Sequence, residues 1–115
     1  MADGDCIAQL GCWVGYRVWD WRQEDRGGQS WAVLELMPDE AAERLCSGCD
    51  QPVAAIHDQS LRRIRDLPLF EHAVELVVPR LRLACPRCGP RLERLDWIDP
   101  HARVTRRLAE SEARL

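Results

Sequence analysis

The alternation of apolar and polar residues predicts a β-rich first third of the chain. Aromatic and β-branched residues recur along residues 13–22, with tryptophans at alternate positions, and such residues fit the pleated surface of a strand. Residues 26–28, Arg-Gly-Gly, predict a turn, and the apolar run 31–37 predicts the returning strand. We therefore expect an N-terminal β-hairpin whose tryptophans lie in the core.

Three further runs in the middle of the chain read as strands. They cover residues 53–57, 61–67 and 73–84, and the polar run 58–60 between the first two predicts a turn. Pro79 falls inside the third run, and proline within a sheet is confined to edges and bulges. The expected arrangement is a small antiparallel sheet.

The pattern changes to helical spacing near the C-terminus. Asp99 is a favourable N-cap residue and Pro100 is favoured at the first helical position. Val104, Leu108 and Leu115 then follow at helical spacings. We expect a single amphipathic helix here, beginning near Pro100.

Two Cys-x-x-Cys motifs flank the middle strands and bring candidate chemistry to them. Cys46 and Cys49 form the first motif, and Cys85 and Cys88 form the second. Two such loops can place four thiolates at the corners of a tetrahedron, the geometry of a structural Zn²⁺ site. An iron site of the rubredoxin type fits the same spacing. A disulfide pair is disfavoured because nothing in the sequence indicates secretion.

The residues that follow each motif predict the shape of a metal-binding knuckle. Gly89 follows Cys88, where the chain must turn back with a positive φ, and glycine adopts that conformation without steric cost. Asp50 follows Cys49, and aspartate tolerates the left-handed region better than most residues. In such a turn, backbone N–H groups point at the sulfur atoms.

Cys6, Cys12 and His57 are assigned no metal. Cys6 and Cys12 stand apart from the four paired cysteines and are interpreted as small apolar residues. His57 lies beside the expected turn and is interpreted as a structural histidine, with a fifth metal ligand as the alternative.

Together these patterns predict an α+β chain: a small antiparallel β-rich zinc ribbon with an N-terminal β-hairpin and a C-terminal helix. The expected regions are an acidic hairpin over residues 1–44, the ribbon over 45–95 and the helical segment over 96–115. So short a ribbon cannot bury a sufficient apolar core, so the metal is expected to stabilise it.

Charge is distributed unevenly along the chain. All 16 basic residues are arginine, and the formal net charge is −3. Residues 1–45 hold nine acidic residues and four arginines, a net charge of −5, whereas residues 46–115 hold ten and twelve, a net charge of +2. Arginine forks suit phosphate oxygens. The candidate DNA-binding residues are Arg62, Arg63, Arg65, Arg80, Arg82 and Arg87.

These arginines predict a single patch if their strands are neighbours. Arg63 and Arg65 lie two apart on one strand, as do Arg80 and Arg82 on another, so each pair projects from one face. For Arg62, Arg63 and Arg65, the alternative interpretation is a solvated strand face in which Arg65 or Arg63 pairs with Asp66 or Asp58.

The sequence also indicates the cellular compartment in which the protein is expected. No apolar run approaches the roughly 20 residues needed to span a bilayer, and the N-terminus is acidic, unlike a signal peptide. A reducing cytoplasm and no membrane partner are therefore expected.

The order of the motifs resembles the N-terminal zinc-finger region of the ISL-three family of insertion-sequence transposases. The resemblance rests on both Cys-x-x-Cys motifs, on the run 62–68 (Arg-Arg-Ile-Arg-Asp-Leu-Pro) and on the run 80–83 (Arg-Leu-Arg-Leu) between them. Residues 105–108 and Trp97 resemble the lead into the family's helix-turn-helix.

The resemblance implies a nucleoid-associated protein that binds Zn²⁺ and the terminal inverted repeats of double-stranded DNA. It also implies that the Asp-Asp-Glu catalytic domain lies beyond residue 115, so no catalytic residue is expected in this chain. Asp58, Asp66 and Asp99 are interpreted as turn and cap residues. The alternative function is a protein-interaction module or regulatory remnant of a transposase, and a homo-oligomer is a further candidate assembly.

Overall fold

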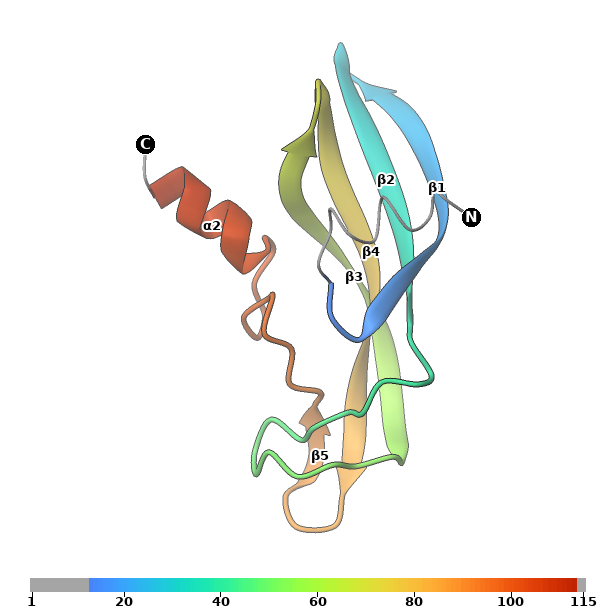
Figure 1. Cartoon of the computed structure of the whole chain (residues 1–115), viewed down its shortest axis with the longest axis vertical. Coiled ribbons are helices and arrows are strands. Elements are labelled where there is room, and N and C mark those ends of the chain that lie inside the picture. The colour runs from blue at the N-terminus through green and yellow to red at the C-terminus, as the bar shows by residue number, and fades with distance from the viewer. Residues whose placement is uncertain (1–12, 114–115) are drawn as a thin grey trace.

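A computed structural model describes residues 13–113 of the chain. Within these residues, five strands form one sheet, and a single α-helix follows them (Figure 1). The molecule is elongated, with extents of 48 × 35 × 22 Å. The elements are β1 (Tyr16–Arg26), β2 (Gln29–Pro38), β3 (Ile56–Leu69), β4 (His72–Cys85), β5 (Gly89–Leu92) and α2 (Arg106–Ala113).

The predicted N-terminal hairpin is present and consists of β1 and β2. The two strands pair antiparallel from Tyr16 opposite Pro38 to Arg26 opposite Gln29. Gly27 and Gly28 form the two-residue turn with φ values of 60° and 86°, and turns of this kind match the right-handed twist of the strands they connect.

The middle of the chain forms one long hairpin where the sequence predicted three strands. β3 and β4 pair from Ile56 opposite Leu83 to Leu69 opposite His72. The predicted turn at residues 58–60 was wrong, because these polar residues lie inside β3 and pair with residues 80–82. Their side chains stay polar at little cost because this part of β3 is exposed.

The sheet is mixed and not purely antiparallel as expected. Strands that follow one another in the sequence and pair do so antiparallel, but one pair of strands is parallel. The strand order is β1-β2-β4-β3, with β5 paired to β4, and β2 runs parallel to β4 from Trp31 opposite Ala73 to Glu35 opposite Val77. The chain is thus a small β-rich ribbon with one short C-terminal helix, as predicted. The predicted boundaries between its regions stay predictions.

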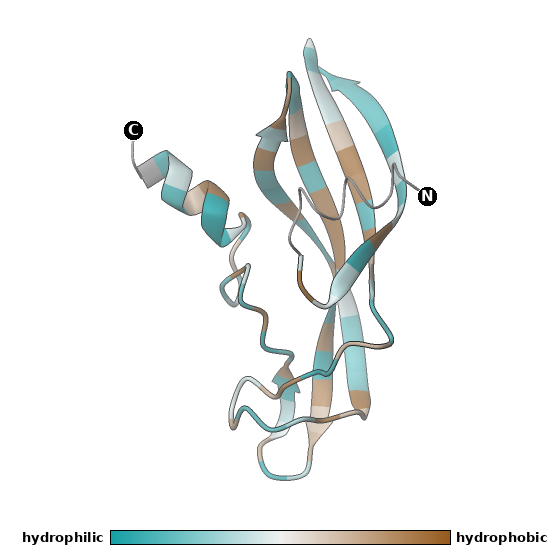
Figure 2. Ribbon diagram, in the orientation of Figure 1, coloured by the Kyte–Doolittle hydropathy of each residue, from teal (hydrophilic) through white to brown (hydrophobic). Residues whose placement is uncertain are grey.

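The sheet buries a different face at each end. Val74, Leu76 and Val78 of β4 belong to the larger core, whereas Leu81 and Leu83 belong to a second core beside the cysteines. Because side chains alternate along a strand, these two sets lie on opposite faces. Figure 2 shows the apolar stripes concentrated in the upper strands.

Pro79 lies where the buried face changes. The pairing of β4 with β2 ends at Val77, and the next backbone contact on that side is from the N–H of Glu93 to the carbonyl of Leu81 (2.8 Å). Between these two points β4 pairs only with β3. Proline cannot donate a backbone hydrogen bond. The edge position predicted for Pro79 is therefore confirmed locally.

The tryptophans of β1 are not all in the core, contrary to the prediction. Trp13 is buried, but Trp19 and Trp21 are 61% and 56% exposed. β1 is an edge strand, and its register shifts between Val18 and Asp20. Because of this irregularity, Trp19 does not follow the alternation of inward and outward side chains that the sequence suggested.

Asp66 is a buried junction between three segments and not the turn or cap residue that was predicted. Its carboxylate accepts hydrogen bonds from Trp13 Nε1 (2.8 Å), Thr105 Oγ1 (2.7 Å) and Arg107 Nε (2.8 Å). Burial raises its pKa, but the donated hydrogen bonds outweigh that effect and hold the pKa below its ordinary value. The buried carboxylate of Asp66 therefore connects the N-terminal segment, β3 and the start of the helix.

The helix begins at Arg106, later than predicted, because Thr105 is its N-cap. Thr105 Oγ1 accepts a hydrogen bond from the N–H of Leu108 (3.3 Å). Asp99 instead forms a turn, in which its carbonyl accepts from the N–H of Ala102 (3.1 Å). No helix in residues 13–113 is long and apolar enough to cross a membrane.

We predict that Asp66→Asn lowers the free energy of unfolding by about 3 kcal/mol, because it removes the buried charge that accepts from Trp13, Thr105 and Arg107 and turns amide hydrogens toward donors. The matched control is Asp58→Asn, since Asp58 lies on the same strand and pairs with Arg82 while both side chains are nearly half exposed. That control should cost less than about 1 kcal/mol. Urea unfolding measures both, and equal losses would contradict the role of Asp66.

The same carboxylate sets a pH dependence. Its folded pKa lies below the ordinary 3.8, so its contribution to stability is present above that value and is lost as pH falls through the folded pKa. The difference in stability between wild type and Asp66→Asn should therefore shrink below about pH 4. An undiminished difference at pH 2.5 would contradict this.

Candidate metal centre and nucleic-acid interface

The two Cys-x-x-Cys motifs meet at one end of the sheet. The first lies in the connection between β2 and β3, and the second forms the turn from β4 into β5 (Figure 1). Cys46 bridges to Glu93, and the N–H of Ser47 donates to the carbonyl of Leu92 (3.2 Å). These backbone contacts hold the first motif against β5.

Both motifs have the predicted knuckle conformation. Asp50 and Gly89 have positive φ values of 61° and 75°. In the first motif the N–H of Asp50 donates to the carbonyl of Cys46 (2.8 Å), and the N–H of Gly48 donates to Cys46 Sγ (3.3 Å). The backbone thus folds back toward the sulfur atoms.

The four cysteine sulfur atoms all lie within 4.8 Å of one another. The sulfur atoms of Cys49 and Cys85 are 3.7 Å apart, which matches the edge of about 3.8 Å for a tetrahedron with Zn–S bonds of about 2.3 Å. A disulfide requires a sulfur–sulfur distance of about 2.05 Å, and all four cysteines are free. The geometry fits Zn²⁺ and excludes the disulfide interpretation for this structure.

The surroundings of the sulfur atoms favour thiolates unequally. Hydrogen bonds from the N–H groups of Cys88 and Arg87 lower the pKa of Cys85 to about 7. Burial and the neighbouring thiols raise the pKa of Cys88 to about 12. Four thiolates at this separation repel one another, so a divalent cation is needed to hold all four deprotonated. Bound Zn²⁺ supplies that charge and cross-links the two loops.

Gly48 leaves the space that brings the two motifs together. A Cβ atom on Gly48 would lie 2.9 Å from Cys88 Sγ and 3.6 Å from Arg91 Nε. Real Cβ atoms do not approach sulfur this closely, so any larger residue must push the loops apart. Position 48 therefore requires a residue without a side chain because of the limited space, and not because of its φ value.

The six predicted DNA-binding arginines do not form one patch. The register pairs Arg80 with Ser60 and Arg82 with Asp58, whereas Arg63 pairs with Val77. By alternation Arg62, Arg80 and Arg82 share one face of the sheet, and Arg63 and Arg65 lie on the other. The patch predicted from the pairs of arginines was therefore wrong in its geometry.

Arg63 and Arg65 both have interaction partners on their face of the sheet. Arg63 pairs with Glu75 (3.0 Å), which also pairs with Arg26 (2.9 Å). The guanidinium of Arg65 lies over the ring of Trp31, 5.5 Å from its centroid. Arg63 thus pairs with Glu75 and not with the Asp58 or Asp66 that was suggested, and Arg65 packs against an aromatic ring.

The other four predicted arginines each have a different environment. Arg80 is buried, and its Nη2 donates to the carbonyl of Glu93 (3.2 Å). Arg82 forms an exposed ion pair with Asp58, and Arg62 donates to the carbonyl of Ala102 (3.3 Å). Arg87 is exposed on the second knuckle.

Several residues near this end were not singled out from the sequence. Arg91, Arg94 and Arg106 gather around a groove that includes Arg80 and Arg82. The signal available in the sequence was the density of arginines immediately after the second motif. His57 is exposed on β3 and outside the group of cysteines. Cys6 and Cys12 lie outside the described residues.

We predict that Gly48→Ala weakens Zn²⁺ binding by at least about tenfold, because the added methyl group displaces Cys88. Competition with a chromophoric chelator measures the affinity. Ser47→Ala is the matched control, since Ser47 is exposed and its side chain can be lost without a steric clash. Equal affinities for Gly48→Ala and the control would contradict the packing argument.

Comparison with known proteins agrees with these features. The family model described as the zinc-finger of transposase IS204/IS1001/IS1096/IS1165 matches residues 42–88. The whole chain is 41% identical to the transposase for insertion sequence element IS1001 from Bordetella parapertussis, of which it spans 28% of the length. No solved structure matches the chain. The chain carries the zinc-finger region of the ISL-three transposase family.

Proposed function

We propose that this chain is a zinc-dependent DNA-recognition region of an insertion-sequence transposase. Cys46, Cys49, Cys85 and Cys88 bind one Zn²⁺, and nearby arginines bind the phosphates of double-stranded DNA. The observation that carries the proposal is the position of the four-cysteine cluster beside arginines of β4 and β5. The similarity to a transposase supports the same partner.

The DNA contacts are proposed for the end of the sheet that holds the cysteines. Arg80 and Arg82 share a face, and Arg87 is exposed on the adjoining knuckle. Arg62 lies on the same face, further along β3. A role for Arg63 and Arg65 in DNA binding stays a prediction, and their contacts with Glu75 and Trp31 on the opposite face give it less support.

We assign no part of strand cleavage and rejoining to the four cysteines; in the intact transposase these reactions are proposed for other residues. In residues 13–113 the four cysteines are the one group of three or more Cys, His, Asp or Glu placed to share a metal ion. Their closed, four-thiolate arrangement is typical of a structural site, in contrast to catalytic zinc sites that keep one position open for water.

A protein-interaction module is the second candidate. β1 is an edge strand that exposes Trp19 and Trp21, and exposed edge strands can pair with another chain. The acidic residues concentrated in the first 45 positions would favour a basic partner. A homo-oligomer formed through this edge belongs to the same proposal.

We predict that the zinc-loaded chain binds a fluorescent duplex with a dissociation constant of about 10⁻⁴–10⁻⁶ M at physiological salt, because phosphate contacts release counterions. The logarithm of the affinity should fall linearly with the logarithm of the salt concentration. Removal of the metal with a chelator should abolish binding, since the loops that carry the arginines then lose their anchor.

The control for sequence recognition is an unlabelled duplex with a scrambled sequence. Recognition of an element end requires that a terminal-repeat duplex compete better than the scrambled one. If the chain binds no duplex even at low salt, or binds equally well without metal, the DNA-recognition proposal is wrong and the interaction module becomes the leading candidate.

A further inference from the structure

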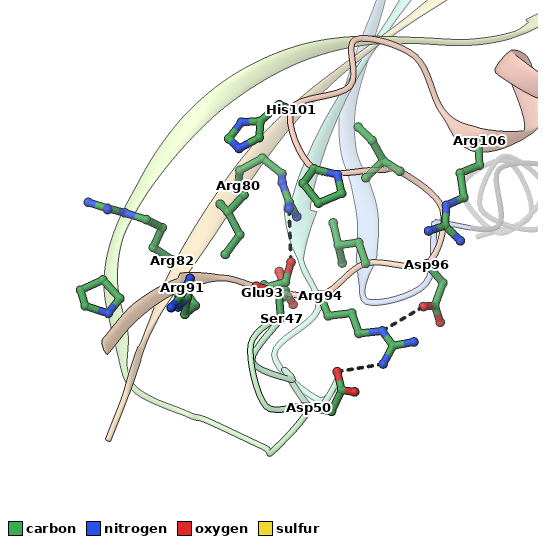
Figure 3. Close-up of a pocket in the computed structure, with 15 residues that line it drawn as sticks. Ser47, Asp50, Arg80, Arg82, Arg91, Glu93, Arg94, Asp96, His101 and Arg106 are labelled. Atoms are coloured by element: carbon green, nitrogen blue, oxygen red, sulfur yellow. Dashed lines mark hydrogen bonds and ion pairs between the residues drawn. The ribbon is translucent and has the colours of Figure 1, made fainter. Parts of the chain in front are cut away.

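A groove of about 570 Å³ lies beside the metal centre, between the first knuckle, β4, β5 and the segment that leads to α2 (Figure 3). Five arginines line it, which is the largest share of any residue type there. They come from β4, from β5 and its following segment, and from the start of α2. These residues are Arg80, Arg82, Arg91, Arg94 and Arg106.

The acidic residues of the groove do not balance these arginines. Asp50 and Asp96 carry negative charge, and Glu93 is the third acidic residue in the lining. Glu93 is buried, and burial raises the pKa of its carboxyl group.

Ion pairs show which of the five arginines are engaged. The hydroxyl of Tyr16 lies 2.7 Å from the carbonyl oxygen of Pro79 and 2.9 Å from Glu93 Oε1, so Glu93 is held in the wall of the groove. Arg82 pairs with Asp58, and Arg106 pairs with Asp99 (2.6 Å); neither aspartate belongs to the lining. The arginines left to receive an anion are therefore Arg80, Arg91 and Arg94.

Arg80 has an unmet requirement for an acceptor. Its side chain is buried in the groove wall, where Nη2 donates to the Glu93 carbonyl. Its Nη1 is buried and has no hydrogen-bond partner in the structure. A buried donor without an acceptor costs about 1–3 kcal/mol. An anion that settles in the groove can supply this acceptor.

Arg91 and Arg94 are available at the solvent side of the groove. Arg91 is exposed, and its side chain forms no hydrogen bond or ion pair within residues 13–113. Arg94 pairs with Asp50 (2.8 Å) and Asp96 (3.6 Å), but these side chains are at least half exposed. Ion pairs this exposed contribute little, so Arg94 can exchange them for a stronger anionic ligand.

We propose that this groove binds one phosphate group of the DNA backbone, with Arg91 and Arg94 as its principal ligands and Arg80 in its wall. The inference rests on the proposed DNA-recognition function and locates its contact. Guanidinium forks match the oxygens of a phosphate in pairs, and an arginine-lined concavity suits an anion that projects from a larger molecule. Duplex DNA presents such phosphates, and free phosphate ions present the same chemistry.

The test compares Arg91→Ala/Arg94→Ala with wild type in titrations of a fluorescent duplex at several salt concentrations. Loss of one phosphate contact should lower the magnitude of the salt slope by about one and weaken binding. The matched control is Arg17→Ala/Arg103→Ala, which removes two exposed arginines outside the groove lining and should leave the slope unchanged. Zinc content and circular dichroism verify that all three proteins are folded.

The outcomes separate the two proposals. If wild type binds DNA but the groove variant binds like wild type, or if both double variants lose equally, the groove is not the phosphate site although DNA recognition stands. If wild type binds no DNA, the proposed function itself fails. A second arm adds inorganic phosphate at constant ionic strength. Loss of duplex binding at low millimolar phosphate would assign the groove to free phosphate and overturn the DNA contact.

Discussion

The closeness of four cysteine sulfur atoms is the constraint on which one end of this molecule depends. The sulfur atoms come from two loops about 40 residues apart in sequence, yet they lie within 4.8 Å of one another. The apolar core at this end is small and includes Cys46 and Cys85 themselves. Few apolar contacts are therefore available to hold the loops together, so the bonds to a bound metal ion must supply most of the stability.

The other end of the molecule depends on apolar burial and one buried carboxylate. The larger core lies on the opposite face of the sheet, and Asp66 connects it to Trp13 and to the residues at the start of the helix. The long strand β4 belongs to both ends and changes its buried face at Pro79. The arginine-lined groove lies near this change, where the segment after β5 crosses toward the helix.

Local chemistry could be predicted from the sequence, and long-range register could not. The spacing of the cysteines and the positive φ of Asp50 and Gly89 follow from short motifs. The helix start was misplaced because Thr105 becomes the cap while it also donates to Asp66, a contact between distant segments. The arginines of β3 and β4 were assigned to one patch because their faces depend on a strand pairing that no single strand encodes.

The most direct test of this account is hydrogen exchange measured by mass spectrometry with and without a zinc chelator at neutral pH. Amide protection reports the local free energy of opening. The account predicts that metal removal abolishes protection in residues 45–55 and 82–94, while residues 64–78 in the larger core keep theirs. Unchanged protection around the cysteines after the metal has been removed would contradict it.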